Sequence, residues 1–417
     1  MPKTLISLFT GAGGIDYGFE AAGFDVAAAV EMDEDCCRTL KSNRDWPVLC
    51  RDIHDTPSEE LLEVRGLGPG EVGVVVGGPP CQPFSKSSFW TRDGTRRMKD
   101  PRAQTLVAFM RVVEDTLPKA FMLENVHGIA YSGKEEGFQV LRQLTDQINQ
   151  RAGVSYRLSF QVLNTADFGV PQARRRFFLI GRRDGKEFKF PTPRFADHSN
   201  GSEPSLFDSA VEPYRTAWDA IGDLQPDPNE DLSVKGSWAE LLPSIPEGEN
   251  YLWHTDRKGG MPLFGWRTRY WSFLLKLAKD RPSWTIQAQP GPSIGPFHWE
   301  SRLLSTREMA RLQTFPDDVE ITGNRPAIQR QLGNAVPSLM AEVLAREISV
   351  QVLGEDDRHR NTEPRLLPPV RKPVPEPEPI KPVPKKYHKF KGDHKAHPGT
   401  GKGRAARKRK AQAQSDS

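Results

Sequence analysis

Residues 72–85 limit the possible fold of this chain most strongly. The segment VGVVV, at 72–76, is a short β-branched apolar run of the kind that forms a buried central strand, and GGPPCQPFS follows it directly. Two glycines and two prolines end the strand and place Cys81 on a stiff loop at its carboxyl end, where open α/β sheets bind their ligands. Cys81 is therefore a candidate nucleophile, although a lone cysteine beside a turn is more commonly a small buried residue.

A second strand-and-turn unit begins the chain. TLISLF, at 4–9, predicts a first strand, and the glycine-rich TGAGG that follows leads into a helical pattern. Such a turn lets the backbone approach a ligand closely. It is not the dinucleotide fingerprint, because Asp16 stands where the third glycine is required, and it lacks the Lys-Ser/Thr pair of a phosphate-binding loop.

Acidic residues follow the next strands. DVAAAVEMD predicts a second strand with Glu31 near its end, about 20 residues after the glycines, where a carboxylate accepts hydrogen bonds from a ribose diol. Asp52, in RDIHD, is a further candidate for this kind of contact, with a solvated loop acid as the alternative. Together these features predict a cofactor that contains adenosine and whose charge is not carried by phosphate.

Charged residues also mark the ends of later strands. KAFMLENV brings Glu124 to the same sheet edge as Cys81, and a charged group at the end of an apolar strand is costly unless it is paired or used in chemistry. In QARRRFF, the alternation of a strand places Arg174 and Arg176 on one face and Arg175 on the other. A solvated face is the simpler interpretation, but the apolar FFLI that follows predicts that at least one guanidinium is held near the strand end.

Length and cysteine content narrow the class of protein. A chain of 417 residues suggests two or more domains. It contains no run of about 18 uncharged apolar residues and leads directly into a strand, so the sequence predicts neither a membrane span nor a signal peptide and favours a cytoplasmic protein. Its four cysteines are too few and too irregularly spaced for a disulfide framework or a zinc site, which predicts reduced thiols and no bound metal.

Several motifs then occur in a fixed order: FTGAGG, Glu31, GGPPCQPFS, LENV, QARRR, RLLSTREMARLQTFPDD and RQLGNAVP. In this order they resemble a DNA (cytosine-5)-methyltransferase of the bacterial restriction-modification type, over roughly residues 4–353. The resemblance implies an α/β fold with a doubly wound, mostly parallel, Rossmann-like sheet. It also predicts a catalytic domain at 1–183, a smaller, irregular target-recognition domain at 184–325, a helix returning to the catalytic domain at 326–354 and a disordered tail at 355–417.

The resemblance also implies the reaction. S-adenosylmethionine donates a methyl group to carbon 5 of a cytosine flipped out of duplex DNA, and Cys81 attacks carbon 6 to activate the ring. Glu124 engages ring nitrogen 3 and the exocyclic amine, Arg176 holds the oxygen at carbon 2, and Arg174 braces the loop. We expect Glu124 to share a proton with the bound cytosine, because an adjacent arginine opposes the rise in pKa that burial causes.

The resemblance implies cofactor contacts at positions far apart in the sequence. They are Phe9, Gly11, Gly13, Glu31, Asp52, Pro80, Asn334 and Val336. The expected partners are the duplex DNA substrate and a cognate restriction endonuclease. The methylation would protect DNA from this endonuclease, and no direct contact between the two proteins is implied. We also expect a monomer.

Two segments are candidates for DNA contacts. The basic loop at 86–102 is suited to close over a phosphate backbone, with a solvated loop as the alternative. The segment at 184–300 interleaves basic and aromatic residues, which suits base edges and phosphates, although surface arginines over a small aromatic core explain the same composition. The interleaved residues are Trp253, Arg257, Lys258, Trp266, Arg267, Arg269, Tyr270 and Trp271.

The end of the chain differs in charge from the rest. Residues 355–417 contain 17 Lys+Arg and 8 Asp+Glu, a net charge of +9, and the whole chain carries +4, which leaves −5 for residues 1–354. Their proline and charge content predicts an extended, disordered spacer that ends in a polycation. We expect the polycation to add nonspecific, salt-sensitive affinity for DNA, with nuclear targeting as the alternative.

Two other functions remain open on the sequence. An RNA cytosine-5 methyltransferase uses a similar scaffold, but the transfer-RNA-directed relatives carry a Cys-Phe-Thr signature that is missing here. A DNA-binding regulator that retains the fold without activity is the other, and the presence of Cys81, Glu124 and Arg176 argues against it.

Overall fold

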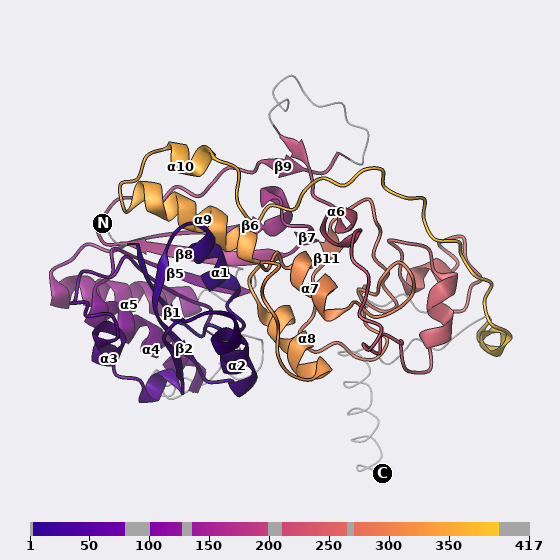
Figure 1. The fold of residues 1–417 in the computed structure, drawn as a ribbon, viewed down its shortest axis with the longest axis horizontal. Coiled ribbons are helices and arrows are strands. Elements are labelled where there is room, and N and C mark those ends of the chain that lie inside the picture. Colours follow the sequence, from indigo (N-terminus) through magenta and orange to yellow (C-terminus); the bar gives the residue numbers. More distant parts are fainter. Residues whose placement is uncertain (1–2, 80–100, 127–135, 199–210, 265–270, 392–417) are drawn as a thin grey trace, which may run out of the picture.

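The computed structural model describes residues 3–79, 101–126, 136–198, 211–264 and 271–391. These residues form two parts that lie side by side: a sheet flanked by helices, and a smaller part with little regular secondary structure (Figure 1). Among the described residues, no helix has the length and apolar character needed to cross a membrane.

The larger part is built on a seven-stranded sheet. Its strands are β1 (Thr4–Leu8), β2 (Asp25–Glu31), β3 (Val48–Cys50), β4 (Val74–Gly77), β5 (Ala120–Val126), β6 (Arg157–Asn164) and β8 (Arg175–Arg182). Their order in the sheet is β3-β2-β1-β4-β5-β8-β6. The first five strands pair in parallel, and β8 is antiparallel to both β5 and β6. The chain runs from β1 outward to β3 and then returns to β4 on the other side of β1, so the predicted doubly wound, mostly parallel sheet is confirmed.

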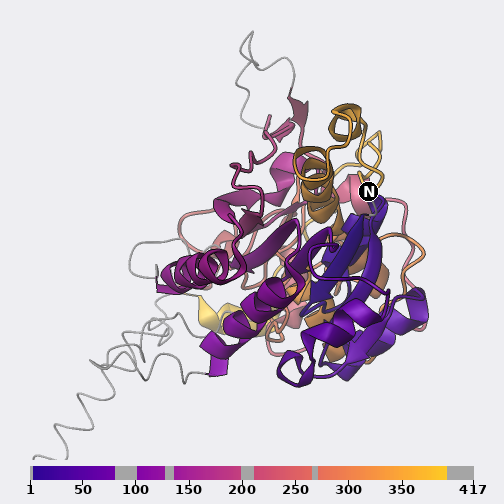
Figure 2. The same ribbon diagram turned by 90° about the vertical axis from the view of Figure 1, so that its left-hand side faces the viewer.

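Helices cover both faces of this sheet (Figure 2). Side chains of one strand alternate between the faces, and Val74 and Val76 therefore belong to one apolar cluster while Val75 belongs to the other. The first cluster includes helices α1 (Gly14–Ala21) and α9 (Ser338–Gln351). The second includes α3 (Ser58–Glu63), α4 (Pro101–Thr116) and α5 (Glu136–Ala152), and α2 (Glu34–Asn43) follows β2.

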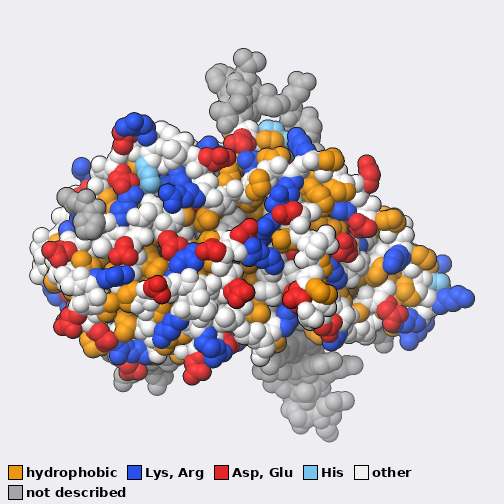
Figure 3. Space-filling view, viewed as in Figure 1, with side chains coloured by type: hydrophobic (Ala, Val, Ile, Leu, Met, Phe, Trp, Pro, Cys, Tyr) orange, Lys and Arg blue, Asp and Glu red, His pale blue; other side chains and the backbone are white. Residues whose placement is uncertain are grey.

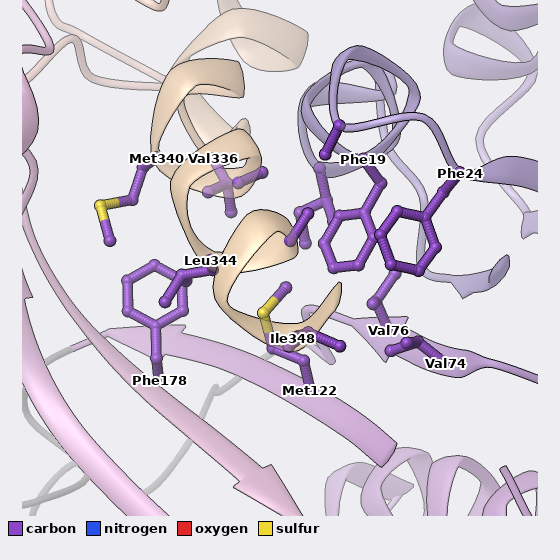
Figure 4. Packing of buried hydrophobic residues seen from close by; sticks show 14 of the residues in the cluster. Phe19, Phe24, Val74, Val76, Met122, Phe178, Val336, Met340, Leu344 and Ile348 are labelled. Carbon is purple, nitrogen blue, oxygen red and sulfur yellow. The ribbon is translucent and has the colours of Figure 1, made fainter. Parts of the chain in front are cut away.

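Helix α9 returns the end of the chain to the sheet and packs directly against α1. Figure 4 shows Met340, Leu344 and Ile348 of α9 among buried side chains of the strands, with Phe19 of α1 beside them. The two helices approach closely because Gly18 has no side chain: a Cβ there would lie 2.2 Å from the Ser338 carbonyl oxygen. A segment more than 300 residues from α1 in the sequence thereby completes the core of the larger part.

The smaller part contains two apolar clusters. The proximal cluster includes residues of α6 (Ala217–Ile221) and α7 (Thr306–Leu312), and it also includes Ala12 and Tyr17, so it continues the packing of the larger part. The second cluster lies in what we call the distal lobe, residues 234–264 and 271–297. Short elements complete this region: β7 (Gln172–Ala173), β9 (Phe195–Ala196), β10 (Glu212–Pro213), β11 (Ser283–Trp284), α8 (Arg325–Asn334) and the 3-10 helices η5 (Ala239–Ser244) and η6 (Tyr251–His254).

The prediction of disorder is wrong for residues 355–391. This segment is extended, as predicted, but it packs along both parts of the molecule and includes α10 (Arg358–Asn361) and η7 (Lys385–Phe390). The composition of the segment does not indicate this packing, because a few specific contacts hold the segment in place. Among the residues that make them is Tyr387, which is 2% exposed. Its prolines also restrict the unfolded chain, so less conformational entropy is lost on packing. Residues 392–417 lie outside the described residues.

Replacing Gly18 with alanine is expected to destabilise the protein. Alanine normally favours a helix over glycine, but here its Cβ would overlap the backbone of α9, with Ser338 oxygen at 2.2 Å and Glu342 nitrogen at 2.7 Å. We expect a loss of about 1–3 kcal/mol in the free energy of unfolding, measured with urea. Gly68→Ala is the control, because its Cβ would meet only the Glu71 side chain, at 3.4 Å. Equal effects of the two substitutions would contradict the close α1–α9 contact.

Asp16, in the first turn of α1, is a fully buried carboxylic acid. Within the described part of the chain, neither of its oxygens has a hydrogen-bond partner of good geometry. Burial, opposed in part by the nearby Ser7 hydroxyl, raises the pKa of Asp16 to about 7 from an ordinary value of 3.8. The native state therefore loses stability as the pH rises from about 4 through about 7, because the unfolded chain ionises first.

The substitution Asp16→Asn should remove this pH dependence. Asparagine does not ionise, so the variant should gain stability relative to the natural chain by about 2 kcal/mol between about pH 5 and about pH 8. Urea unfolding of both proteins at the two pH values measures the difference and cancels the contribution of other groups. A difference that stays constant with pH would show that Asp16 keeps one protonation state.

Candidate active site

The carboxyl ends of β4 and β5 lie next to each other at one edge of the sheet. The two strands are parallel neighbours, with Gly77 opposite Leu123. Gly78 follows directly, and a Cβ built on it would lie 3.2 Å from Oε2 of Glu124. The Glu124 carboxyl group is therefore packed against the backbone that continues from β4.

The same backbone leads to the candidate nucleophile. The side-chain amide of Asn125 donates a hydrogen bond to the Pro79 carbonyl oxygen at 3.3 Å, which ties the end of β5 to the loop that follows β4. Pro80 and Cys81 come next in the sequence and lie outside the described residues. The structure thus places Glu124 beside the start of the loop that carries Cys81.

An ion pair joins Glu124 to Arg176 of β8. Antiparallel pairing sets Arg176 opposite Val126, which makes Glu124 its diagonal neighbour on the same face of the sheet. Arg176 Nε lies 3.1 Å from Glu124 Oε1, and the two side chains are 15% and 12% exposed. Burial raises the pKa of Glu124 above its ordinary value, and the charges of Arg176 and Arg174 oppose that rise. The site therefore presents an acid that is easier to protonate than an exposed glutamate, next to a fixed positive charge.

Arg174 is buried and holds two distant segments together. Its guanidinium donates to the carbonyl oxygen of Gly333 at 2.9 Å and to that of Ile286 at 3.4 Å. Gly333 lies in the last turn of α8, where unpaired carbonyls favour a cation. Burial and the charge of Arg176 lower the pKa of Arg174 to about 9, so it stays protonated at neutral pH. The predicted alternation is confirmed, since Arg175 is exposed.

Glu31, at the end of β2, organises the glycine-rich turn. Its Oε2 accepts a hydrogen bond from the Gly11 N–H at 2.7 Å, and its Oε1 accepts from the N–H groups of Met32 and Asp33 at 2.8 and 2.7 Å. Burial raises the pKa of Glu31, and these three hydrogen bonds oppose the rise. The carboxylate thus holds the turn after β1 against the end of β2.

The turn itself provides open space beside its backbone. Gly11 has a φ of 59°, and a Cβ built on it would meet nothing within 4 Å among the described residues. Gly13 has a φ of 86° and packs against Leu40 and Tyr17. Phe9 has a φ of 54°, a left-handed conformation that is uncommon for a residue with a side chain and that bends the chain out of β1.

Residues from the other end of the chain border this turn. Val336 is 6% exposed, and a Cβ built on Gly14 would lie 2.3 Å from its carbonyl oxygen. Asn334, two residues earlier at the end of α8, is exposed. The structure therefore brings Val336 to the glycine turn, although it lies more than 300 residues from the turn in the sequence.

Asp52 lies two residues beyond the end of β3, at the same edge of the sheet as Glu31. Its carboxylate accepts a hydrogen bond from the His54 N–H at 2.9 Å. Carboxylates of Glu31, Asp33 and Asp52 along one edge would repel a phosphate, whereas they suit a ribose diol and a positively charged sulfonium. Together with the open space at Gly11, these acceptor groups fit the adenosyl group of S-adenosylmethionine.

The segment after residue 280 supports the site in a way that sequence reasoning missed. β11 pairs with β7 directly before the arginines, with Ser283 opposite Gln172 and Trp284 opposite Ala173. Thr285 Oγ1 also donates to the Ala173 carbonyl at 2.8 Å. Two-residue strands are too short to show a hydrophobic period, so no local pattern indicates this support.

Comparison with known proteins identifies the family. The model of the C-5 cytosine-specific DNA methylase family matches residues 3–350. The chain is 42% identical to the Type II methyltransferase M.SacI of Streptomyces achromogenes, over 85% of this chain and 94% of the relative. It is 34% identical to the Type II methyltransferase M1.HphI of Haemophilus parahaemolyticus, over 84% of this chain and 87% of the relative.

Solved structures share the fold at low sequence identity. A putative DNA modification methyltransferase encoded within a prophage of E. coli superposes with a TM-score of 0.55 at 24% identity, over 84% of this chain and 99% of that chain. The Dnmt2 methyltransferase of S. pombe superposes with a TM-score of 0.51 at 16% identity, over 84% and 99% of the two chains. The match to the family model and the identity with M.SacI show that this chain belongs to the C-5 cytosine-specific DNA methylases and is a DNA (cytosine-5) methyltransferase.

Proposed function

We propose that the enzyme methylates a cytosine flipped out of duplex DNA, through a transient covalent bond between Cys81 and carbon 6. The observation that supports this most directly is the Glu124–Arg176 pair beside the backbone that leads to Cys81. A carboxyl group and a guanidinium side by side match the polar edge of cytosine, where the amine and nitrogen 3 adjoin the oxygen at carbon 2.

In this proposal the cysteine activates the ring. The Cys81 thiolate adds to carbon 6, and the electrons of the double bond shift through the ring towards nitrogen 3, which takes up a proton. Carbon 5 becomes nucleophilic and takes the methyl group that S-adenosylmethionine would supply, and the electrons of the broken methyl–sulfur bond stay on the cofactor sulfur. Loss of the proton from carbon 5 to water, departure of the Cys81 sulfur from carbon 6 as a thiolate and return of the nitrogen 3 proton to Glu124 then restore the ring and leave 5-methylcytosine.

In this proposal Glu124 and Arg176 bind different polar atoms of the base. Burial raises the pKa of Glu124, which favours a proton shared between its carboxyl group and nitrogen 3 of the bound base. Arg176 holds the oxygen at carbon 2 and stabilises the carboxylate that remains after the proton has moved. Arg174 does not need to touch the base, because its hydrogen bonds to Gly333 and Ile286 hold the strand that carries Arg176.

The cofactor contacts are also part of this proposal. Glu31 and Asp52 would hold the adenosyl group at their edge of the sheet, and the glycine turn would contact the rest of the cofactor through its backbone. Phe9 and Gly13 belong to this turn and Val336 borders it, whereas Asn334 and Pro80 are proposed contacts from the sequence, and Pro80 lies outside the described residues.

We further propose that methylation protects host DNA from a cognate restriction endonuclease. M.SacI and M1.HphI are both named Type II methyltransferases, and the chain spans most of the length of each. The base-specific contacts would come from the smaller part, whose described basic and aromatic residues include Trp253, Arg257, Lys258 and Trp271. Arg267, Arg269, Trp266, Tyr270 and the basic loop before residue 101 lie outside the described residues.

Replacing Cys81 with serine is expected to reduce methyl transfer to duplex DNA by about 10³-fold or more, because a hydroxyl is a much weaker nucleophile than a thiolate. Transfer of labelled methyl groups to duplex DNA and to transfer RNA, assayed side by side, measures this loss and identifies the acceptor. The natural chain should also form a denaturant-stable adduct with DNA that contains 5-fluorocytosine, and the serine variant should not. A serine variant that methylates at the natural rate would refute the covalent mechanism.

The substitution Glu31→Gln is expected to weaken the binding of S-adenosylmethionine about tenfold. The glutamine amide would present a donor to the N–H groups of the turn and would remove an acceptor from the ribose. Calorimetric titration of the cofactor measures the change. Glu34→Gln is the control, because Glu34 is an exposed carboxylate of the adjoining helix α2. Unchanged affinity in Glu31→Gln would place the ribose elsewhere.

A further inference from the structure

The chain continues beyond the family domain as an extended segment, residues 355–391, which we call the C-terminal strap. The family model ends at residue 350. From α10 the strap runs across the smaller part to its far end, where η7 lies (Figure 1). Its principal contacts lie on α9, on α6 and in the distal lobe.

The first contacts bind the strap to α9 in the larger part. Glu342 and Arg346 form an ion pair on α9 at 2.6 Å, and their side chains are 0% and 6% exposed. Glu342 also accepts hydrogen bonds from the N–H groups of Arg365 and Leu366, at 2.7 and 2.9 Å. Arg346 donates to the Thr362 carbonyl at 3.0 Å. The strap thus completes the coordination of two buried charges.

A second group of contacts lies at α6. The Arg371 N–H donates to the Asp219 carboxylate at 2.7 Å, and its guanidinium pairs with Asp223 at 3.0 Å. Arg215 donates to the Pro368 carbonyl at 3.1 Å. Asp219 is also the residue that closes the capping box at the start of α6. The strap is therefore held where the smaller part meets the larger one.

A buried ion pair of the distal lobe also depends on the strap. Lys279 and Glu247 are 4% and 6% exposed and lie 2.7 Å apart. Lys279 donates to the Glu376 carbonyl and the Glu378 carboxylate, both at 3.1 Å, and Glu247 accepts from the Glu378 N–H at 2.7 Å. A second ammonium, Lys276, is also buried nearby and interacts with both carboxylates. Without the strap, two buried ammonium groups would share one carboxylate.

The strap ends inside the apolar core of the distal lobe. Tyr387 is 2% exposed and belongs to the same cluster as Leu241, Tyr251 and Phe264. Its ring stacks on Trp238, with centroids 5.5 Å apart and planes 13° apart, and its hydroxyl donates to the Ser237 carbonyl at 2.9 Å. The core of the lobe is therefore incomplete without a residue that lies about 90 positions beyond its last segment.

The contacts of the strap are selective. Three of its apolar residues, Val370, Val374 and Ile380, are 55%, 40% and 52% exposed, while Tyr387 is buried. A segment that merely collapsed onto the surface would bury these three aliphatic side chains as well. The specific contacts that Glu378 and Tyr387 make with the distal lobe indicate that the lobe and the strap fold together.

We propose that the C-terminal strap is a positioning element for DNA recognition, with Tyr387 as its principal positioning residue. It completes the distal lobe and links that lobe to α6 and α9, so that the lobe meets DNA in one preformed arrangement. A preformed lobe lowers the ordering cost of binding and therefore lowers the KM for DNA. This proposal rests on the proposed role of the smaller part in base recognition.

The test uses the full-length chain with Tyr387→Ala, Tyr387→Phe and Ile380→Ala. Hydrogen exchange across residues 238–264 reports on the lobe, and steady-state methylation separates KM for cognate duplex DNA from kcat. In Tyr387→Ala we expect exchange to rise at least about tenfold and KM to rise at least about tenfold, with kcat within about twofold. Tyr387→Phe retains the stack and should restore both values, and Ile380→Ala removes an exposed strap side chain and should match the natural chain.

The possible results test two claims separately: that the distal lobe needs the strap, and that the strap lowers the KM for DNA. Faster exchange in Tyr387→Ala with an unchanged KM would show that the strap only stabilises the lobe, and unchanged exchange would show that the lobe does not need it; either result overturns the proposal. A lack of DNA methylation in the natural chain would overturn the proposed function instead, and hydrogen exchange would still report on the lobe. If Tyr387→Ala does not fold, Tyr387→Leu keeps an apolar side chain without the stack and undergoes the same comparison.

A chain that ends at Lys391 separates the strap from the polycation. Exposed lysines gather where the strap ends, at the end of the molecule marked by η7 (Figure 3). Residues 392–417 add 7 Lys+Arg and 2 Asp+Glu. The shortened chain keeps every described strap contact, so we expect its loss of DNA affinity to disappear at about 0.2 M salt, whereas the KM of Tyr387→Ala should stay raised. A Tyr387→Ala defect that also disappears with salt would contradict a positioning role.

Discussion

The close contact between α1 and the end of the chain is the constraint on which the rest of the structure depends. Gly14 and Gly18 of α1 lie so near the backbone of Val336 and Ser338 that no side chain fits between them. Because the glycine turn of the site leads directly into α1, the same contact sets the position of that turn against Val336. The core of the larger part and the position of the glycine turn at the candidate cofactor site therefore depend on one interface.

Three buried charges in the described part of the chain are paired with groups from distant segments. Arg174 binds carbonyls that lie 112 and 159 residues away, and Glu342 and Lys279 are each completed by the C-terminal strap. A desolvated charge is costly unless several partners surround it, so each of these groups is stable in one arrangement of the chain. Such contacts orient the parts of the molecule relative to each other more strictly than apolar packing does, since hydrogen bonds depend on direction.

The strap shows that the family domain and the folding unit have different limits. The family model ends before α9 does, yet the cluster of the distal lobe includes Tyr387. The enzyme therefore combines a catalytic sheet whose motifs resemble those of its relatives with a lobe that depends on a segment outside that family pattern. This arrangement links the end of the chain to the part of the molecule that we propose to read DNA.

Local sequence patterns determined the strands of the sheet and the chemistry along its edge. The β-branched run before the GGPP turn, the glycine turn after β1 and the acids that end β2 and β5 were all recognisable, because strand periodicity and turn residues act over a few positions. The family resemblance then supplied roles for Cys81, Glu124 and Arg176. Only the tertiary structure decided which partners those groups have: the ion pair of Glu124 with Arg176, the hydrogen bonds of Glu31 to its own turn and the seat of Tyr387 in the distal lobe. Such contacts depend on surfaces that exist only after folding. The composition of the strap predicted disorder because it averages over many exposed prolines and charges, whereas a few buried residues hold the strap in place.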